Sequence, residues 1–145
     1  MPEQRTDSAV HVAIDLRAVV ARLLRRFREA GADDEITPSQ ASALARLSKG
    51  GVSTVSVLAA AEKVRPQSMA ATIEALESAG LVTRTPDPRD GRRQIIDLTE
   101  AGWQHVEGQR EAGAAWLEET LGTRVSADEL RTLGEAVAIL QRVLA

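Results

Sequence analysis

The chain of 145 residues contains no cysteine, no tyrosine, one phenylalanine and two histidines. The absence of cysteine excludes disulfides, thiolate metal sites, a cysteine nucleophile and a cysteine redox sensor. His11 and His105 are far apart in the sequence and form no spaced metal-binding motif, so we predict no metal site. Aromatic residues make up only 2% of a sequence that is 43% hydrophobic. The core must therefore be aliphatic, which favours closely packed helices.

Long apolar segments are also missing. No run approaches the length that spans a bilayer, and the first residues lack the apolar stretch of a signal peptide. We therefore expect a soluble, cytoplasmic protein without a membrane partner. The sequence also lacks a glycine-rich phosphate loop and a paired histidine–carboxylate motif. We predict that the protein is not an enzyme and uses no cofactor.

Positive charge is concentrated in one short segment of this acidic chain. The net charge is −3, whereas residues 84–93 carry four arginines and two aspartates, a local excess of +2. Such a patch is typical of a protein that binds a polyanion, because the overall charge alone would repel one. A solvated surface loop whose arginines bind nothing is the alternative. The four arginines are Arg84, Arg89, Arg92 and Arg93.

The same segment has the sequence of a β-hairpin with the four arginines at its tip. Pro86 and Pro88 cannot continue a strand ladder, and Asp90-Gly91 is a strong turn dipeptide. Apolar residues resume soon afterwards. We predict a hairpin over about residues 82–98.

Helical periodicity and capping signals predict six helices. Capping boxes at Thr37–Gln40 and Ser126–Glu129 open the second and the last, and Thr99 caps the fifth. Gly31 and the polar segment Asp33-Asp34-Glu35 end the first. The predicted helices cover about residues 8–30, 38–50, 55–63, the stretch from a turn at 64–68 to Gly80, 100–121 and 127–144. Residues 52–54 could form a very short strand.

Two short helices joined by a tight turn, followed by an arginine-rich hairpin, indicate a winged helix-turn-helix. In that arrangement the start of the second helix faces base edges in the major groove. Arginine can bond guanine, glutamine can pair with adenine, and small or hydroxyl side chains allow close approach. Simple capping and solvation of a helix start is the competing interpretation. The candidate recognition residues are Arg65, Gln67, Ser68, Ala71 and Thr72.

Residues 37–102 resemble the winged-helix core of the multiple-antibiotic-resistance regulator (MarR) family. The most specific matches are Asp87-Pro-Arg-Asp-Gly-Arg92 and Leu98-Thr-Glu-Ala-Gly102. Weaker matches are Leu58-Ala59 and Gly80-Leu-Val82. The flanking helices match in length and order, so the resemblance extends over nearly the whole chain.

The resemblance implies a homodimer that reads a pseudo-palindrome in double-stranded DNA. It makes Arg89 the wing-tip side chain in the minor groove, with Asp87 orienting it and Asp90 and Arg92 bracing the hairpin. It also implies that a small aromatic or phenolic effector could release the DNA. We predict such a ligand where the first and fifth helices meet the winged core, within reach of arginines such as Arg17 or Arg25.

The aliphatic stripes of the first and last helices support dimerisation independently, because the small central unit cannot cover them. We therefore predict a mainly α fold with a winged helix-turn-helix core, a two-stranded wing, and N- and C-terminal dimerisation helices. The core would span residues 37–99 of a single unit of 145 residues, and the dimerisation helices residues 8–30 and 100–145. The predicted function is a ligand-responsive transcriptional repressor. The alternative is a winged-helix module that binds an acidic protein instead of specific DNA.

Overall fold

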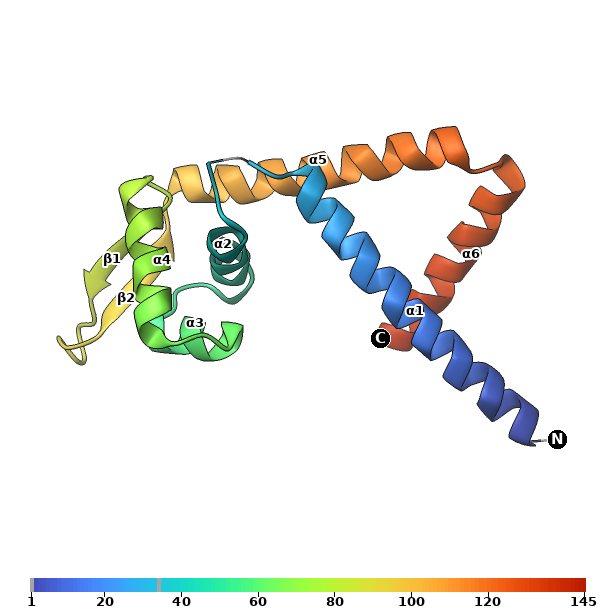
Figure 1. Ribbon diagram of the computed structural model, residues 1–145, viewed down its shortest axis with the longest axis horizontal. Coiled ribbons are helices and arrows are strands. Elements are labelled where there is room, and N and C mark those ends of the chain that lie inside the picture. The colour runs from blue at the N-terminus through green and yellow to red at the C-terminus, as the bar shows by residue number, and fades with distance from the viewer. Residues whose placement is uncertain (1, 34) are drawn as a thin grey trace. The chain divides into compact units, whose positions relative to one another are not determined.

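A computed structural model describes the backbone of residues 2–33 and 35–145, and the side chains of residues 8–33 and 35–145 (Figure 1). Asp34, which the sequence analysis places in the segment that ends the first helix, lies outside the described residues. The elements, in chain order, are α1 (Pro2–Ala30), α2 (Pro38–Gly50), α3 (Val55–Glu62), α4 (Pro66–Ser78), β1 (Val82–Pro86), β2 (Gln94–Leu98), α5 (Glu100–Arg124) and α6 (Ala127–Leu144). This order of helices and strands confirms the predicted fold class.

The chain divides into two compact units. The winged unit is Gly31–Arg110, and the helical unit combines Met1–Ala30 with Glu111–Ala145. Helix α5 contributes its first half to the winged unit and its second half to the helical unit. No helix among the described residues has the length and apolar character needed to cross a membrane.

A dry aliphatic core holds the winged unit together. Residues at helical spacing on α4 (Met69, Ile73 and Leu76) are almost completely buried, as the sequence pattern predicts. They pack with α2, α3, both strands and the start of α5. The other buried members of the cluster are Ala43, Leu44, Leu47, Leu58, Ala59, Val82, Ile96, Leu98 and Val106. In Figure 1 the helices α2, α3 and α4 gather beside the hairpin.

The wing is an antiparallel pair of strands in which Val82 lies opposite Leu98 and Pro86 opposite Gln94. Its second strand also pairs with the segment between α2 and α3. Ser53 and Ile96 exchange two backbone hydrogen bonds of 3.0 and 2.8 Å. The very short strand expected at residues 52–54 is therefore present as a single bridge.

Capping places most helix boundaries where the sequence predicts them. Both predicted capping boxes form, at Thr37 with Gln40 and at Ser126 with Glu129. Helix α2 ends at Gly51, whose φ of 76° is a left-handed conformation that favours glycine. Other predicted boundaries are wrong. Helix α1 begins at Pro2 rather than Ser8, and α5 runs past Leu121 to Arg124, because a single glycine at position 122 costs a helix only about 1 kcal/mol.

The helical unit has a different character. At the end of α1, Phe27 packs edge-on against Trp116 of α5 with ring centroids 6.0 Å apart, and the Arg26 guanidinium lies 5.6 Å from the centroid of the same indole. Helix α6 has no buried residue. Large aliphatic side chains of α1 and α6 are instead exposed to solvent in the single chain.

Candidate nucleic-acid interface

The helix-turn-helix consists of α3, the turn formed by residues 63–65, and α4. Lys63 ends α3 in a left-handed conformation (φ 56°), and its N–H donates to the carbonyl groups at the end of that helix. The predicted turn over residues 64–68 is too long. Helix α4 begins at Pro66, because proline suits the first helical position, where its missing N–H leaves no bond unmade.

The predicted recognition residues lie at the start of α4, away from its buried face. Arg65 is the N-cap residue, and its side chain makes no capping hydrogen bond. Gln67, Ser68 and Ala71 are exposed. Thr72 is half-buried, and its hydroxyl donates to the Ser68 carbonyl oxygen at 3.1 Å. Four of the five side chains are thus open to a partner, and Thr72 is the one already engaged by the helix.

The wing tip is ordered by hydrogen bonds within the loop. The Asp87 carboxylate accepts from the Arg89 backbone N–H at 2.8 Å, and the Asp90 carboxylate accepts from the Arg92 backbone N–H at 3.1 Å. Two backbone bonds, Asp87 N–H to the Arg93 carbonyl and Arg93 N–H to the Asp90 carbonyl, close the loop. Both aspartates therefore fix the backbone and leave the arginine side chains unrestrained.

Three guanidinium groups of the wing are available to a polyanion. Arg89, Arg92 and Arg93 are exposed, and among the described side chains none provides them with a hydrogen bond or an ion pair. Unpaired arginines need no existing bond to be broken before they contact phosphate. The wing therefore presents a concentrated positive charge on a protein of net charge −3.

Arg84 is different, and the prediction that it lies on the hairpin tip is wrong. It lies within β1, opposite Ile96, on the same strand face as the buried Val82. Its guanidinium forms two hydrogen bonds with the Glu77 carboxylate of α4, from Nε at 3.1 Å and from Nη2 at 2.8 Å. This pairing lowers the pKa of Glu77 below its ordinary value.

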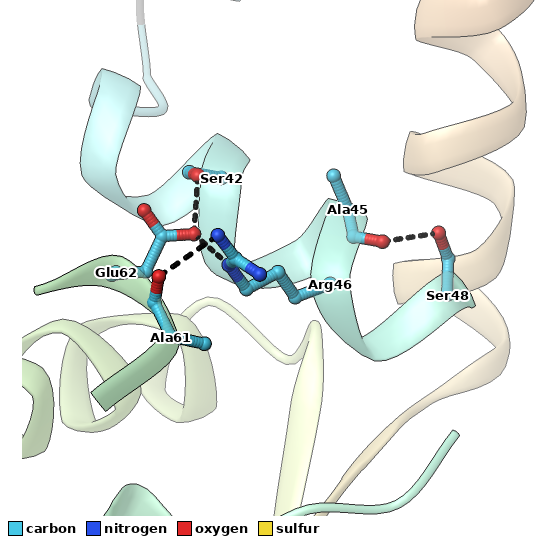
Figure 2. Close-up of polar contacts among 6 residues, drawn as sticks. All are labelled: Ser42, Ala45, Arg46, Ser48, Ala61 and Glu62. Atoms are coloured by element: carbon cyan, nitrogen blue, oxygen red, sulfur yellow. Dashed lines mark hydrogen bonds and ion pairs between the residues drawn. The ribbon is translucent and has the colours of Figure 1, made fainter. Parts of the chain in front are cut away.

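A second polar cluster joins α2 to the end of α3 (Figure 2). The Glu62 carboxylate accepts a hydrogen bond from the Ser42 hydroxyl at 2.6 Å and forms an ion pair with the Arg46 guanidinium. Arg46 also donates to the Ala61 carbonyl oxygen at 3.0 Å, one of the carbonyl groups that the end of α3 leaves without a helical partner. The Ser42 hydrogen bond and the nearby Arg46 lower the pKa of Glu62, although burial opposes them. The cluster fixes the helix-turn-helix against α2.

Sequence reasoning did not find Glu77, Glu62 or Arg46. Each is a charged residue on a helix, and such residues are mostly solvated. Glu77 and Arg84 are separated by seven residues and Arg46 and Glu62 by sixteen, so helical spacing gives no signal for either pair. Only the chain reversals at Gly80 and between α2 and α3 bring them together.

Comparison with known proteins extends these observations to the whole chain. The sequence matches the pattern of the MarR family over residues 36–93. An HTH-type transcriptional regulator of Mycobacterium tuberculosis is 38% identical over 136 residues, which cover 92% of this chain and 95% of the relative. An HTH-type transcriptional repressor of Pseudomonas putida is 31% identical over 101 residues, which cover 70% and 62% of the two chains.

The fold is also shared by solved structures. A transcriptional regulator protein of Pseudomonas aeruginosa superposes with a TM-score of 0.75 at 30% sequence identity, over 94% of this chain and 96% of that chain. Together, the family pattern, the relative that matches almost end to end and the winged unit described above show that the chain belongs to the MarR family of winged helix-turn-helix transcriptional regulators.

Proposed function

We propose that the protein is a homodimeric repressor that binds a pseudo-palindromic operator in double-stranded DNA, with one winged unit on each half-site. The observation that carries the proposal is the pairing of two features in one unit. An exposed polar start of α4 lies beside a hairpin whose three tip arginines have no partner among the described residues. A module that only binds protein needs no such combination.

Each feature has its own task on the DNA. The start of α4 enters the major groove, where Arg65 and Gln67 can form paired hydrogen bonds with guanine and adenine. Arg89 at the wing tip enters the minor groove, and Arg92 and Arg93 contact the phosphates beside it. The recognition helix therefore selects the sequence, and the wing supplies most of the electrostatic attraction.

The exposed aliphatic faces of the helical unit support the homodimer. On α6 the side chains of Leu133, Val137 and Leu144 recur at helical spacing and are 43%, 53% and 86% exposed. On α1, Val12 and Val19 are 60% and 57% exposed. A second copy would bury these faces, and each fully buried valine or leucine contributes roughly 1.5–3 kcal/mol. Two copies would also supply the two recognition helices that a pseudo-palindrome requires.

The test is operator binding measured by fluorescence anisotropy, with DNA from upstream of the gene and a scrambled duplex as competitor. With about four to eight phosphate contacts per dimer, the logarithm of the affinity should fall with the logarithm of salt concentration by about 0.9 per contact. Arg89→Ala should weaken binding to both duplexes alike. Gln67→Ala should cost about 1–3 kcal/mol on the operator and relax base choice. Arg131→Ala, a substitution in α6, is the matched arginine control.

Two results would overturn the proposal. Equal affinity for the operator and the scrambled duplex would remove the claim of sequence-specific binding. A monomer at micromolar concentration in sedimentation would remove the homodimer. Binding to an acidic protein with no DNA binding would instead favour the interaction-module alternative.

We propose a cytoplasmic protein that releases its operator when a small aromatic or phenolic ligand binds. Arg26, Glu29, Ala30 and Trp116 line a shallow hollow in the helical unit, where a cation and an indole could hold an aromatic acid. Arg25 is one of the predicted ligand-binding arginines, and its Nε lies 3.9 Å from the Glu29 Oε1, so it already has an ion-pair partner. A screen of aromatic acids and phenols, with peroxide and zinc as controls, tests this; release by the controls alone would contradict it.

A further inference from the structure

We propose that Glu77 and Arg84 are positioning residues for DNA binding, because their ion pair sets the angle of the wing relative to the recognition helix. The inference rests on the proposed function and refines it. It removes Arg84 from the set of DNA-contacting arginines and assigns a role to an acidic side chain on a helix that faces a polyanion.

The contact joins the two DNA-binding elements directly. Glu77 lies in the last turn of α4, and Arg84 is the middle residue of β1. The guanidinium and the carboxylate meet through two hydrogen bonds, at 3.1 and 2.8 Å, so both groups are held in a defined orientation rather than by charge alone. The Arg84 side chain is 31% exposed and the Glu77 side chain 38% exposed. The pair is thus sheltered enough to persist and shallow enough to be broken without opening the core.

The second strand of the wing is held at the same position along the hairpin. Arg84 lies across the ladder from Ile96, and Ile96 is the residue that exchanges two backbone hydrogen bonds with Ser53. One cross-section of the hairpin is therefore fixed twice, by backbone bonds along the β2 edge and by the Glu77–Arg84 side-chain pair on one face of β1. Beyond it, the hydrogen bonds of the tip loop involve only other tip residues.

This geometry makes the fixed cross-section the hinge of the wing. Arg89 follows Arg84 by five residues, which span up to about 16 Å at roughly 3.3 Å per residue. A rotation of about 10° at the hinge would then move the tip by about 3 Å, as far as the length of a hydrogen bond. Loss of the pair should therefore misplace Arg89 relative to the recognition helix even though neither partner touches the DNA.

The proposal predicts that removing the Glu77 carboxylate weakens DNA binding, whereas charge repulsion alone predicts that it strengthens binding. Deleting a negative charge from a surface that faces DNA normally strengthens binding. We instead expect Glu77→Gln to weaken operator affinity about tenfold, roughly the loss of one hydrogen bond to a charged group. Glu74→Gln is the matched control on the same helix. Glu74 is exposed and makes no hydrogen bond to Arg84, so its loss should leave affinity equal or higher.

A double-mutant cycle separates positioning from direct contact. Arg84→Gln should also weaken binding about tenfold, and the double variant should bind no worse than either single variant, because one pair is lost in all three. The sign of the Glu77→Gln effect decides between the two roles. If Arg84 contacted phosphate, Arg84→Gln would still weaken binding, but Glu77→Gln would tighten it, because the freed guanidinium could then contact the DNA more strongly.

Wing mobility gives a readout that a purely stabilising pair would not change. The chain has no cysteine, and a Cβ at Gly91 would meet no heavy atom within 4 Å apart from those of its neighbours in the chain, so Gly91→Cys can carry a spin label at the wing tip. The label should move over a wider range in Glu77→Gln than in Glu74→Gln, with equal thermal midpoints. If Glu77→Gln proves unstable, Glu77→Asp, whose shorter side chain cannot keep both bonds, replaces it.

The outcomes are distinguishable. If the wild type binds its operator and Glu77→Gln binds equally well or more tightly, or if label mobility is unchanged, the positioning role is wrong and the proposed function stands. If the wild type shows no sequence-specific binding, the proposed function fails and the positioning role fails with it.

Discussion

The winged unit and the helical unit differ in how much of their apolar side-chain surface is buried within one chain. Every buried hydrophobic side chain among the described residues lies in the winged unit, which closes its core within a single chain. In the described part of the helical unit only Gly113 is buried, and most valines and leucines on the described parts of α1 and α6 remain exposed. The winged unit therefore buries its apolar side chains within one copy of the chain. The helical unit leaves a large apolar surface exposed in one copy. This is why we propose a second copy as its partner.

Replacing one leucine by alanine in each unit should give the largest difference between the two units, in unfolding free energy for one and in dimer dissociation for the other. Leu76 is fully buried on α4, and Leu133 is 43% exposed on α6. Leu76→Ala leaves a cavity and should lower the free energy of unfolding of the winged unit by about 2–5 kcal/mol in urea. Leu133→Ala should leave that unit unchanged and raise the dissociation constant of the dimer, measured by sedimentation of dilute protein. If Leu133→Ala has the same dissociation constant as the wild type, Leu133 is not part of the interface.

Three glycines of α5 extend the comparison along one helix. A Cβ at Gly102, in the winged unit, would lie 2.1 Å from the Leu81 carbonyl oxygen, whereas a Cβ at Gly113, in the helical unit, would meet the Phe27 Cβ at 3.3 Å. Gly102→Ala must displace backbone and should destabilise the protein by about 1–3 kcal/mol. At Gly113 the neighbour needs to move by only a few tenths of an ångström, so alanine should cost much less than at Gly102.

Gly108 serves as the control for these glycine substitutions. No atom lies within 4 Å of a Cβ there, so Gly108→Ala should stabilise α5 by about 0.5–1 kcal/mol through its better helix propensity. Thermal unfolding of the three variants side by side is the measurement. Equal effects at Gly102 and Gly113 would show that the two units are packed equally tightly.

Local signals in the sequence predict most of the winged unit. The capping box at Thr37, the buried stripe of α4 and the hairpin depend on neighbouring residues, and all of them form. Where a residue's role depends on its near neighbours, the sequence is sufficient.

The errors arise where tertiary contacts decide. Arg84 has the same charge as the tip arginines and lies in the same short segment, and only the return of the chain at Gly80 places it against Glu77. The roles of Arg65, Gln67 and Arg89 on DNA stay predictions, because an exposed side chain can bind partners of several kinds. The limits of residues 37–99 as a separate core also stay a prediction.

A further modest effect concerns the ion pair that fixes α3 against α2. The Ser42 hydrogen bond and Arg46 lower the pKa of Glu62 in the folded chain, so the charged form is favoured there. Its stabilisation is therefore fully present above the ordinary glutamate pKa of 4.5 and is lost as pH falls through the lowered folded value. Glu62→Gln should cost about 1 kcal/mol at pH 7, a modest figure because Arg46 is 46% exposed.

The pH dependence provides the check. In urea titrations from pH 7 to pH 3, the difference in unfolding free energy between wild type and Glu62→Gln should shrink as the wild-type carboxylate becomes protonated. Glu118→Gln, an exposed substitution in the helical unit, should show no such trend, because Glu118 has no ion pair among the described residues. A constant difference across the whole range would mean that the Glu62 charge does not hold α3 against α2. The winged unit would then depend on its aliphatic core alone.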